Sequence, residues 1–457
     1  MRRVALLIPL VVLVACAPGR APERTSRAPA ATQPLPPMKL FAPRRAAPTN
    51  RTNAEIARDF LDLSFQMESG RPLDRMSRFE GAITLRVIGR APPSMGPDLG
   101  RLLSRLRNEA GIEIAQVSGD EPANITIEAM PQAQLQRLVP KAACFVVPRV
   151  SSWSDFRRNR RGRTTDWTTL TTREQVAVFV PNDVSPQEVR DCLHEELAQA
   201  LGPLNDLYRL PDSVFNDDNF HTVLTGFDML MLRAYYAPEM RSGMTRAQAA
   251  AVLPGVLARL NPRGLRQPRR AFASTPRAWI NAIETSLGPR TGNTRRRNAA
   301  REAVDIARAR GWEDNRLAFA LFSFARLTAN QNPEASLAAF AEANAIYAAS
   351  PDTQLHAAHV ATHLAVFALS AGRLDTALAL IDRSVPAVER AENAALLSTL
   401  LMIRAETLEQ MGRRTEAQAT RLDSLGWARY GFGADDTVRA RLREIAALAP
   451  RPPRFGG

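Results

Sequence analysis

The residues with the clearest capacity for chemistry lie together in LHEELAQALGPLND, from Leu193 to Asp206. Histidine and glutamate side chains serve as general acids and bases in hydrolytic enzymes. On a helix they also bind zinc when two ligands stand four residues apart. Counted from His194, the position four residues on is Ala198, which offers no ligand atom. The register that starts at His194 therefore cannot hold zinc through the helix.

A register that starts one residue later has the spacing of a known zinc motif. It puts Glu195, Gln199 and Asn205 in three ligand places, Glu196 beside the first, and Gly202 where the chain turns. This spacing resembles the metzincin pattern His-Glu-x-x-His-x-x-Gly-x-x-His with every histidine replaced. The resemblance implies the general-base place for Glu196.

The resemblance continues beyond the helix. DSVFND, from Asp212 to Asp217, resembles the metzincin methionine turn with Phe215 in the methionine place, and LTGFDMLMLRAYYAP (224 to 238) resembles the closing helix. About residues 55 to 245 are covered, and the resemblance implies an α+β domain with a mixed sheet and an active-site-type helix. Together with the lipobox and paired cysteines described below, these motifs also resemble a domain-of-unknown-function family of proteobacterial lipoproteins, for which no established activity is implied.

The replaced ligands change the chemistry that we expect. Oxygen ligands such as those of Glu195, Gln199 and Asn205 suit a hard cation better than zinc. We therefore expect no resident metal or other cofactor, and a degenerate domain that binds a ligand. Two alternatives stay open: hydrolysis with Glu196 or Glu195 as general base and His194 as acid, and a purely structural hydrogen-bond network.

The remaining histidines form two further groups. His221 lies between the turn and the closing helix, where it could approach the cleft and restore one histidine ligand. His356, His359 and His363 stand at i, i+3 and i+7 of one predicted helix. This spacing could support a metal, but without an acidic neighbour it is more typical of packing between helices.

The elements that must position these side chains follow from hydrophobic periodicity. Helical spacing predicts helices over 53–67 and 97–111, and apolar residues predict strands over 82–89, 112–117, 124–130 and 175–181. An insertion is expected near 148–170. The order of strands and helices indicates a compact α+β domain over 51–245, with the LHEEL helix directly after the last strand.

Beyond residue 245 strand patterns disappear and helical patterns continue. We expect a helical connector over 246–300 and helical repeats over 301–450. Segments starting at Asn332, Gly372 and Gly412 lie 40 residues apart (372 − 332 and 412 − 372). This period resembles tetratricopeptide-like repeats, which implies an all-α solenoid with a surface for a protein partner. A plain helical bundle is the alternative.

The first residues predict where the protein works. MRRVALLIPLVVLVAC has two arginines and then 12 apolar residues before Cys16, too few to span a bilayer. This resembles a lipoprotein signal over 1–15, which implies a lipid on Cys16 and anchoring in the bacterial cell envelope, at the outer membrane facing the periplasm. An ordinary secretory signal is the alternative. Residues 16–50, rich in proline, are predicted to form an exposed tether.

The charge and the two other cysteines complete the prediction. Of 60 basic residues 58 are arginine, and the basic runs lack interleaved aromatic residues, so the net charge of +14 does not indicate a nucleic-acid partner. Cys144 and Cys192 are expected to form a disulfide in an oxidising compartment, with two buried free thiols as the alternative.

Overall fold

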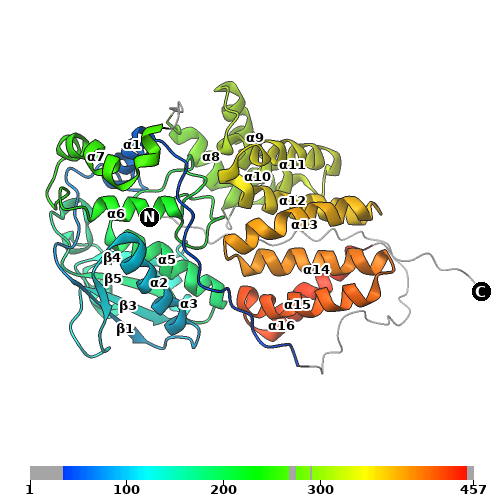
Figure 1. Ribbon diagram of the computed structural model, residues 1–457, viewed down its shortest axis with the longest axis horizontal. Coiled ribbons are helices and arrows are strands. Elements are labelled where there is room, and N and C mark those ends of the chain that lie inside the picture. The colour runs from blue at the N-terminus through cyan, green and yellow to red at the C-terminus, as the bar shows by residue number, and fades with distance from the viewer. Residues whose placement is uncertain (1–33, 267–273, 289–290, 450–457) are drawn as a thin grey trace, which may run out of the picture. The chain divides into compact units, whose positions relative to one another are not determined.

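The computed structural model describes residues 34–266, 274–288 and 291–449. Cys16 and the predicted signal peptide lie outside these residues. The described chain forms two compact units, residues 42–275 and residues 34–41 with 276–449. We describe each unit by itself (Figure 1).

The first unit holds one sheet and the helices around it. Its elements are α1 (Asn53–Ser64), β1 (Ile83–Gly89), α2 (Met95–Ala110), β2 (Ile114–Gln116), β3 (Ile125–Met130), α3 (Gln132–Leu138), β4 (Phe145–Pro148), α4 (Trp153–Asn159), the short 3-10 helices η1 (Arg163–Thr165) and η2 (Trp167–Thr169), β5 (Val176–Pro181), α5 (Pro186–Leu201), α6 (Gly226–Tyr235), α7 (Arg246–Leu260) and η3 (Pro262–Arg266).

The five strands form a mixed sheet in the order β2-β1-β3-β5-β4. The first four run parallel, and β4 pairs antiparallel with β5 at one edge. The α+β prediction and its four strands are confirmed. The order of the two strands along the chain would make 112–117 and 124–130 a strand pair, but they do not pair with each other, because β1 lies between them.

The strand β4 is absent from the sequence prediction. Its four residues FVVP are all buried, so they show no alternation of apolar and polar side chains. A fully apolar run of this length cannot be assigned by periodicity alone. Its place in the sheet depends on pairing with β5, where Phe145 lies opposite Phe179.

Apolar packing covers both faces of this sheet. On one face the strands share a large core with α1, α2, α5 and α6, which includes Leu102, Leu197 and Leu230. On the other, Phe145, Phe179 and the aromatic rings of α4 form a smaller cluster. The helix α5 is therefore almost wholly buried, and polar side chains on it lie inside the protein.

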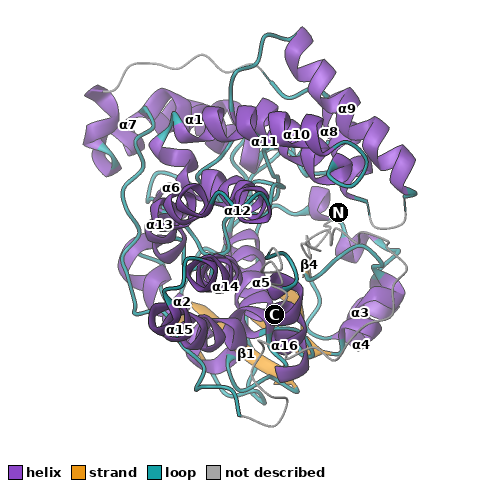
Figure 2. Ribbon diagram, turned by 90° about the vertical axis from the view of Figure 1, so that its right-hand side faces the viewer, coloured by secondary structure: helices purple, strands orange, loops and turns teal. Residues whose placement is uncertain are grey.

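The second unit is a stack of helices. They are α8 (Arg277–Leu287), α9 (Asn293–Ala309), α10 (Asn315–Thr328), α11 (Pro333–Ala348), the 3-10 helix η4 (Pro351–Thr353), α12 (Gln354–Ser370), α13 (Leu374–Arg390), α14 (Ala394–Gln410), α15 (Arg414–Phe432) and α16 (Asp435–Ala446). Each helix packs on the next, and α12, α14 and α16 also contact in turn. Figure 2 views α12 to α15 nearly along their axes.

The helix starts keep the predicted period. The second helices of successive hairpins begin at Pro333, Leu374 and Arg414, just after the predicted turns. Gly372 and Gly412 have φ values of 71° and 77°, a left-handed conformation that favours glycine after a helix. These glycines let the chain reverse direction in a short turn, so that each helix packs antiparallel to the one before it.

The boundary between the units lies between Thr275 and Pro276. Within the segment expected to be a connector, α7 packs on α1 and α6 in the first unit, whereas α8 and α9 belong to the helical stack. No helix within the described ranges is long and apolar enough to cross a membrane.

The described part of the expected tether makes specific contacts. Residues 34–50 are mostly exposed, but the Ala46 amide donates to Glu109 (3.4 Å) and Thr49 Oγ1 to Asp212 (3.4 Å). Proline content predicts an extended backbone, which these residues have. It does not show whether such a segment is bound along its length.

Candidate functional site

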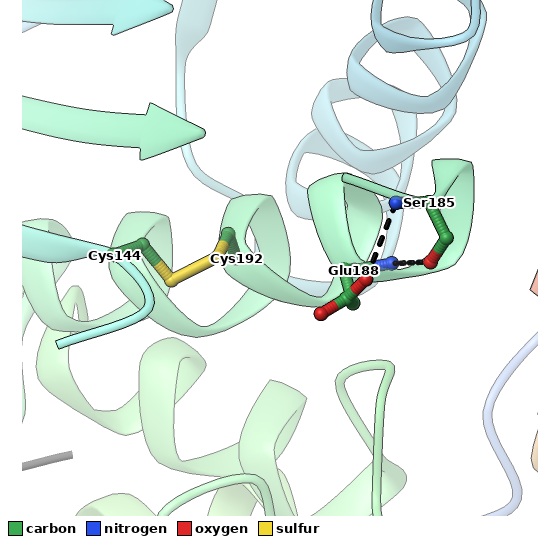
Figure 3. Close-up of a disulfide and its surroundings, with 4 residues drawn as sticks. All are labelled: Cys144, Ser185, Glu188 and Cys192. Atoms are coloured by element: carbon green, nitrogen blue, oxygen red, sulfur yellow. Dashed lines mark hydrogen bonds between the residues drawn. A yellow bond between two sulfur atoms is a disulfide. The ribbon is translucent and has the colours of Figure 1, made fainter. Parts of the chain in front are cut away.

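The start of α5 is fixed by its sequence. Ser185 caps the helix by accepting from the Glu188 amide (3.2 Å), and the Glu188 carboxylate accepts from the Ser185 amide (3.2 Å). Pro186 occupies the first helical position, where no amide hydrogen is needed. Figure 3 shows this capping box at the start of the helix, with Cys192 further along it. It fixes which way each later side chain of α5 points.

A disulfide joins the residue directly before β4 to α5. Cys144 and Cys192 are bonded, with their Cα atoms 5.9 Å apart (Figure 3). The disulfide prediction is confirmed over the alternative of two free thiols. The bond secures the middle of α5 to the edge strand, next to the candidate site.

The polar residues of α5 gather on one face. Cys192, Glu195, Glu196 and Gln199 stand at i, i+3, i+4 and i+7, which is a single stripe of a helix. Glu196 and Gln199 have no exposed surface, while Glu195 is partly exposed. The two carboxylates and Cys144 Sγ lie within 4.8 Å of one another. Because Cys144 is in a disulfide, it offers no thiolate to a metal. The atoms of this stripe that could bind a metal are therefore side-chain oxygens.

His194 points away from that stripe. Its Nδ1 accepts a hydrogen bond from the Leu224 amide (3.1 Å) in the segment before α6. Burial first, and then the charges of Arg190, Arg105 and Arg101, hold the pKa of His194 well below its usual range. The imidazole is therefore neutral, and its Nδ1 is occupied as an acceptor. The structure does not bring His194 together with Glu195 and Glu196.

The two amides in the predicted ligand places hold neighbouring segments together. Gln199 Nε2 donates to the Glu68 carboxylate (3.4 Å), and Asn205 Nδ2 donates to the Asp62 carbonyl (2.9 Å). Both partners lie at or after the end of α1. Each side chain thus directs its amide NH2 group toward a partner and does not use its amide oxygen there. Glu195 is the one predicted ligand place that holds a carboxylate.

This donor set does not fit zinc. Zinc sites in proteins are built from imidazole, thiolate and carboxylate ligands, and the places at positions 195, 199 and 205 provide one carboxylate and two amides. Gln199 Oε1 is buried and has no hydrogen-bond partner within the described part of the chain. An uncharged oxygen of this kind is a ligand for a hard cation or an acceptor for a polar ligand.

A buried arginine closes the C-terminal end of α5. The Arg173 guanidinium donates to the carbonyls of Gln199 (2.5 Å), Ala200 (2.7 Å) and Gly202, and lies 4.9 Å from the ring centroid of Trp167. The last carbonyls of a helix lack intrahelical partners and carry a partial negative charge. Arg173 meets both needs and holds the helix end next to the candidate site.

The turn after α5 is also locked by hydrogen bonds. Phe215 is fully buried, its carbonyl accepts from the Leu207 amide (2.9 Å), and its amide donates to Ser213 Oγ (2.9 Å). Ser213 Oγ donates in turn to the Asp228 carboxylate (2.5 Å). Burial raises the pKa of Asp228 to about 6, although hydrogen bonds such as those from Ser213 and Thr225 oppose the rise. The Phe215 side chain is therefore part of the apolar core beneath this turn.

A buried charge network links α1 to the same turn. Asp59, with no exposed surface, accepts from Arg51 (3.1 Å) and Arg209 (2.7 Å), and Arg51 Nε also donates to Asp212 (2.9 Å). Burial favours a higher pKa for Asp212, but the charge and hydrogen bond of Arg51, and then the interaction with His221, hold that pKa below its usual value. His221 therefore lies close enough to Asp212, at the start of the turn, to interact with it electrostatically.

The histidines of α12 pack against aromatic rings. The His363 ring stacks on Phe340 with centroids 4.7 Å apart, and the His356 ring lies 5.0 Å from that of Tyr347. Burial, followed by the charge of Arg326, lowers the pKa of His363 to about 3. These histidines lie between helices.

Sequence reasoning missed Arg173, Glu68 and Asp62. Arg173 precedes a strand and Glu68 follows a helix, positions where charged residues are ordinarily exposed. No local pattern marks them, because their partners on α5 and its following loop are 26 to 143 residues away.

No curated protein and no solved structure matches the chain significantly. Residues 53–255, which contain the sheet, α5 and the turn, match the model of a family described as a protein of unknown function (DUF2927).

Proposed function

We propose that this protein is a lipid-anchored component of the bacterial cell envelope that binds and assembles but does not cleave. In this proposal the first unit is a metzincin-like domain without catalytic zinc. The second unit is a tetratricopeptide-like solenoid that binds a protein partner. Cys16 carries the lipid and places the chain at the outer membrane, facing the periplasm.

One observation carries the view that this site is not a catalytic zinc site. The amides in two of the three former ligand places donate to α1 and the loop after it, Gln199 to Glu68 and Asn205 to Asp62. A zinc ligand must instead present a lone pair to the metal. The site is therefore built to hold its own segments in place. The partly exposed Glu195 is its chemical contact with the outside.

The paired carboxylates favour a second candidate function. Glu195 and Glu196 lie within 4.8 Å of one another, and two neighbouring carboxylates can divide the roles of acid and base in hydrolysis. A hydrolase of envelope peptide or polymer would use Glu196 as base. His194 supports it little, since that side chain is bonded to the Leu224 amide.

Metal analysis tests whether the first unit lacks catalytic zinc. We expect purified mature protein to contain less than a stoichiometric amount of zinc and to keep its thermal unfolding temperature in a chelator. Glu195→Ala and Gln199→Ala should not change metal content, and Glu113→Ala, an exposed carboxylate on the same unit, is the matched control. Stoichiometric zinc that is lost in the first two variants and kept in the control contradicts the binding view.

Lipid anchoring has its own test. Mass spectrometry of the mature protein should find an acylated N-terminal Cys16, and Cys16→Ser should move the protein from the membrane fraction to the periplasmic fraction. Globomycin should block the processing of the wild-type chain. An unmodified N-terminus after an ordinary signal cleavage contradicts the anchoring proposal.

A further inference from the structure

A short N-terminal segment lies along the helical unit. Residues 34–41, PLPPMKLF, run extended beside α15, as the dark-blue trace in Figure 1 shows. Two main-chain groups of the segment are hydrogen-bonded: the Lys39 amide donates to the Gly426 carbonyl (3.0 Å), and the Pro36 carbonyl accepts from Arg429 Nη1 (3.0 Å). The segment and α15 belong to one compact unit. These bonds fix its register on the helix.

The side chains of the segment use an aromatic platform. The Phe41 ring stacks on Trp427 with centroids 4.4 Å apart and planes inclined by 27°. Lys39 Nζ lies 5.6 Å from the Trp427 centroid and forms an ion pair with Asp423. A cation and a ring thus share one indole, which adds cation–π attraction to stacking. Because Asp423 is negatively charged, it favours a positively charged side chain at the position of Lys39.

A glycine in α15 makes room for the segment. Gly426 lies within the helix, where glycine is less favourable than alanine. A Cβ at this position would lie 3.0 Å from Lys39 Cγ and 3.2 Å from the Pro37 carbonyl oxygen. These distances are tighter than normal contacts. The absence of a side chain at Gly426 therefore lets the segment approach α15 closely.

The bound segment has the features of a peptide ligand. Three of its eight residues are proline, so its backbone is already extended before binding and loses little conformational entropy. Recognition of extended proline-rich peptides by aromatic surfaces is a general binding mode. Here the surface consists of Asp423, Gly426, Trp427 and Arg429, which we call the α15 face.

We propose that the α15 face is a docking site for extended proline-rich peptides that carry a lysine two residues before an aromatic residue. Residues 34–41 of the same chain are its occupant in cis. A peptide of a partner protein with this pattern competes for the face and releases the segment. The inference rests on the proposed role of the helical unit in binding a protein partner, and it identifies the chemistry of that partner.

Proteolysis tests whether the segment is docked in the full chain. The protein has only two lysines, Lys39 and the exposed Lys141, so a lysine-specific protease reports on each separately. Lys39 should be cut at least about tenfold more slowly in wild type than in Gly426→Leu, because local release must precede cleavage. Cleavage at Lys141 is the internal reference.

A matched variant controls for the effect of leucine on a helix. Gly100 lies in α2, is exposed, and has open space where a side chain would extend. Gly100→Leu should leave the Lys39 rate unchanged. Equal cleavage of Lys39 in wild type and Gly426→Leu shows that the segment is not docked, and it overturns the proposal.

Peptide binding tests whether the face acts in trans. The probe is a fluorescent peptide of residues 34–41, titrated by anisotropy into full chains. The double variant Lys39→Glu, Phe41→Ala weakens the cis segment but leaves the α15 face intact. It should bind the probe about tenfold or more tightly than wild type does, because a tethered competitor has a high effective concentration. Gly426→Leu should not bind it.

The outcomes separate this inference from the proposed function. Protection of Lys39 in wild type without probe binding to the double variant means that the segment is only part of the fold, and it overturns the docking site. Binding of the probe to Gly426→Leu as tightly as to the double variant places the peptide elsewhere and has the same consequence. Either result leaves metal content and lipid anchoring, which test the proposed function, unchanged.

Discussion

Replacement of Arg173 by methionine tests how the candidate site is held. The side chain is buried and donates to three carbonyls at the end of α5 and to Ser77 Oγ (3.2 Å). Hydrogen bonds from a charged donor contribute about 1.5–3 kcal/mol each, but methionine also removes the cost of burying a cation. We expect Arg173→Met to destabilise the end of α5 by about 4 kcal/mol. Lysine keeps the charge without the planar fork, so Arg173→Lys should cost about 2 kcal/mol.

Amide hydrogen exchange is the suitable assay, since a chain of two units need not unfold in one step. The free energy of opening should fall for the amides of residues 198–202 and of Leu204. Arg158→Met is the control, because that side chain is 71% exposed and its ion pair with Asp155 lies on the surface; it should change stability by less than about 0.5 kcal/mol. A loss below about 1 kcal/mol in Arg173→Met would refute the capping role.

Three further predictions concern stability. Because the pKa of His363 is lowered in the folded protein, the unfolded chain binds more protons than the folded chain does below about pH 6.5. The stability of the helical unit should therefore fall by up to about 2 kcal/mol between about pH 7.5 and about pH 5. Thermal unfolding measured over this pH range contradicts the prediction if His363→Phe has the same pH slope as wild type. Replacing both Cys144 and Cys192 by alanine opens a loop with a sequence separation of 48 and should cost about 4 kcal/mol in urea unfolding under oxidising conditions; a variant as stable as the oxidised protein contradicts the role of the bond. Asp59→Asn removes the carboxylate that Arg51 and Arg209 share, while Arg51 keeps its pair with Asp212 and Arg209 its pair with Asp62. The free energy of unfolding, measured by circular dichroism, should fall by about 1.5–3 kcal/mol, whereas a change below about 1 kcal/mol excludes the network as a major contributor.

The sequence predicted the parts of the site that depend on neighbours in the chain. The strand at 175–181 and the helix after it follow from the sequence pattern. The structure adds that Ser185, Pro186 and Glu188 fix the helix start by local capping chemistry. The order of the helical hairpins follows from a period of 40 and from Gly372 and Gly412 in the turns. These signals act over a few residues, so one sequence is sufficient to detect them.

The sequence also grouped side chains that the fold separates. His194 is adjacent to Glu195 in the chain, but 100° of rotation per residue directs it to the segment before α6. Gln199 and Asn205 match ligand spacing, but their amides donate to Glu68 and Asp62. Spacing along a helix defines which residues share a face and gives no information about what that face meets.

The sequence by itself thus determined the α+β and helical architecture, the polar stripe of the helix that contains Glu195 and Glu196, and the availability of two cysteines for a disulfide. The tertiary structure decided that Cys144 meets Cys192, that Arg173 is buried at the end of α5, and that residues 34–41 bind along α15. The reason is the range of the forces involved. Local propensities and capping are encoded within one turn or strand, whereas desolvation and long-range hydrogen bonding depend on which distant segments pack together.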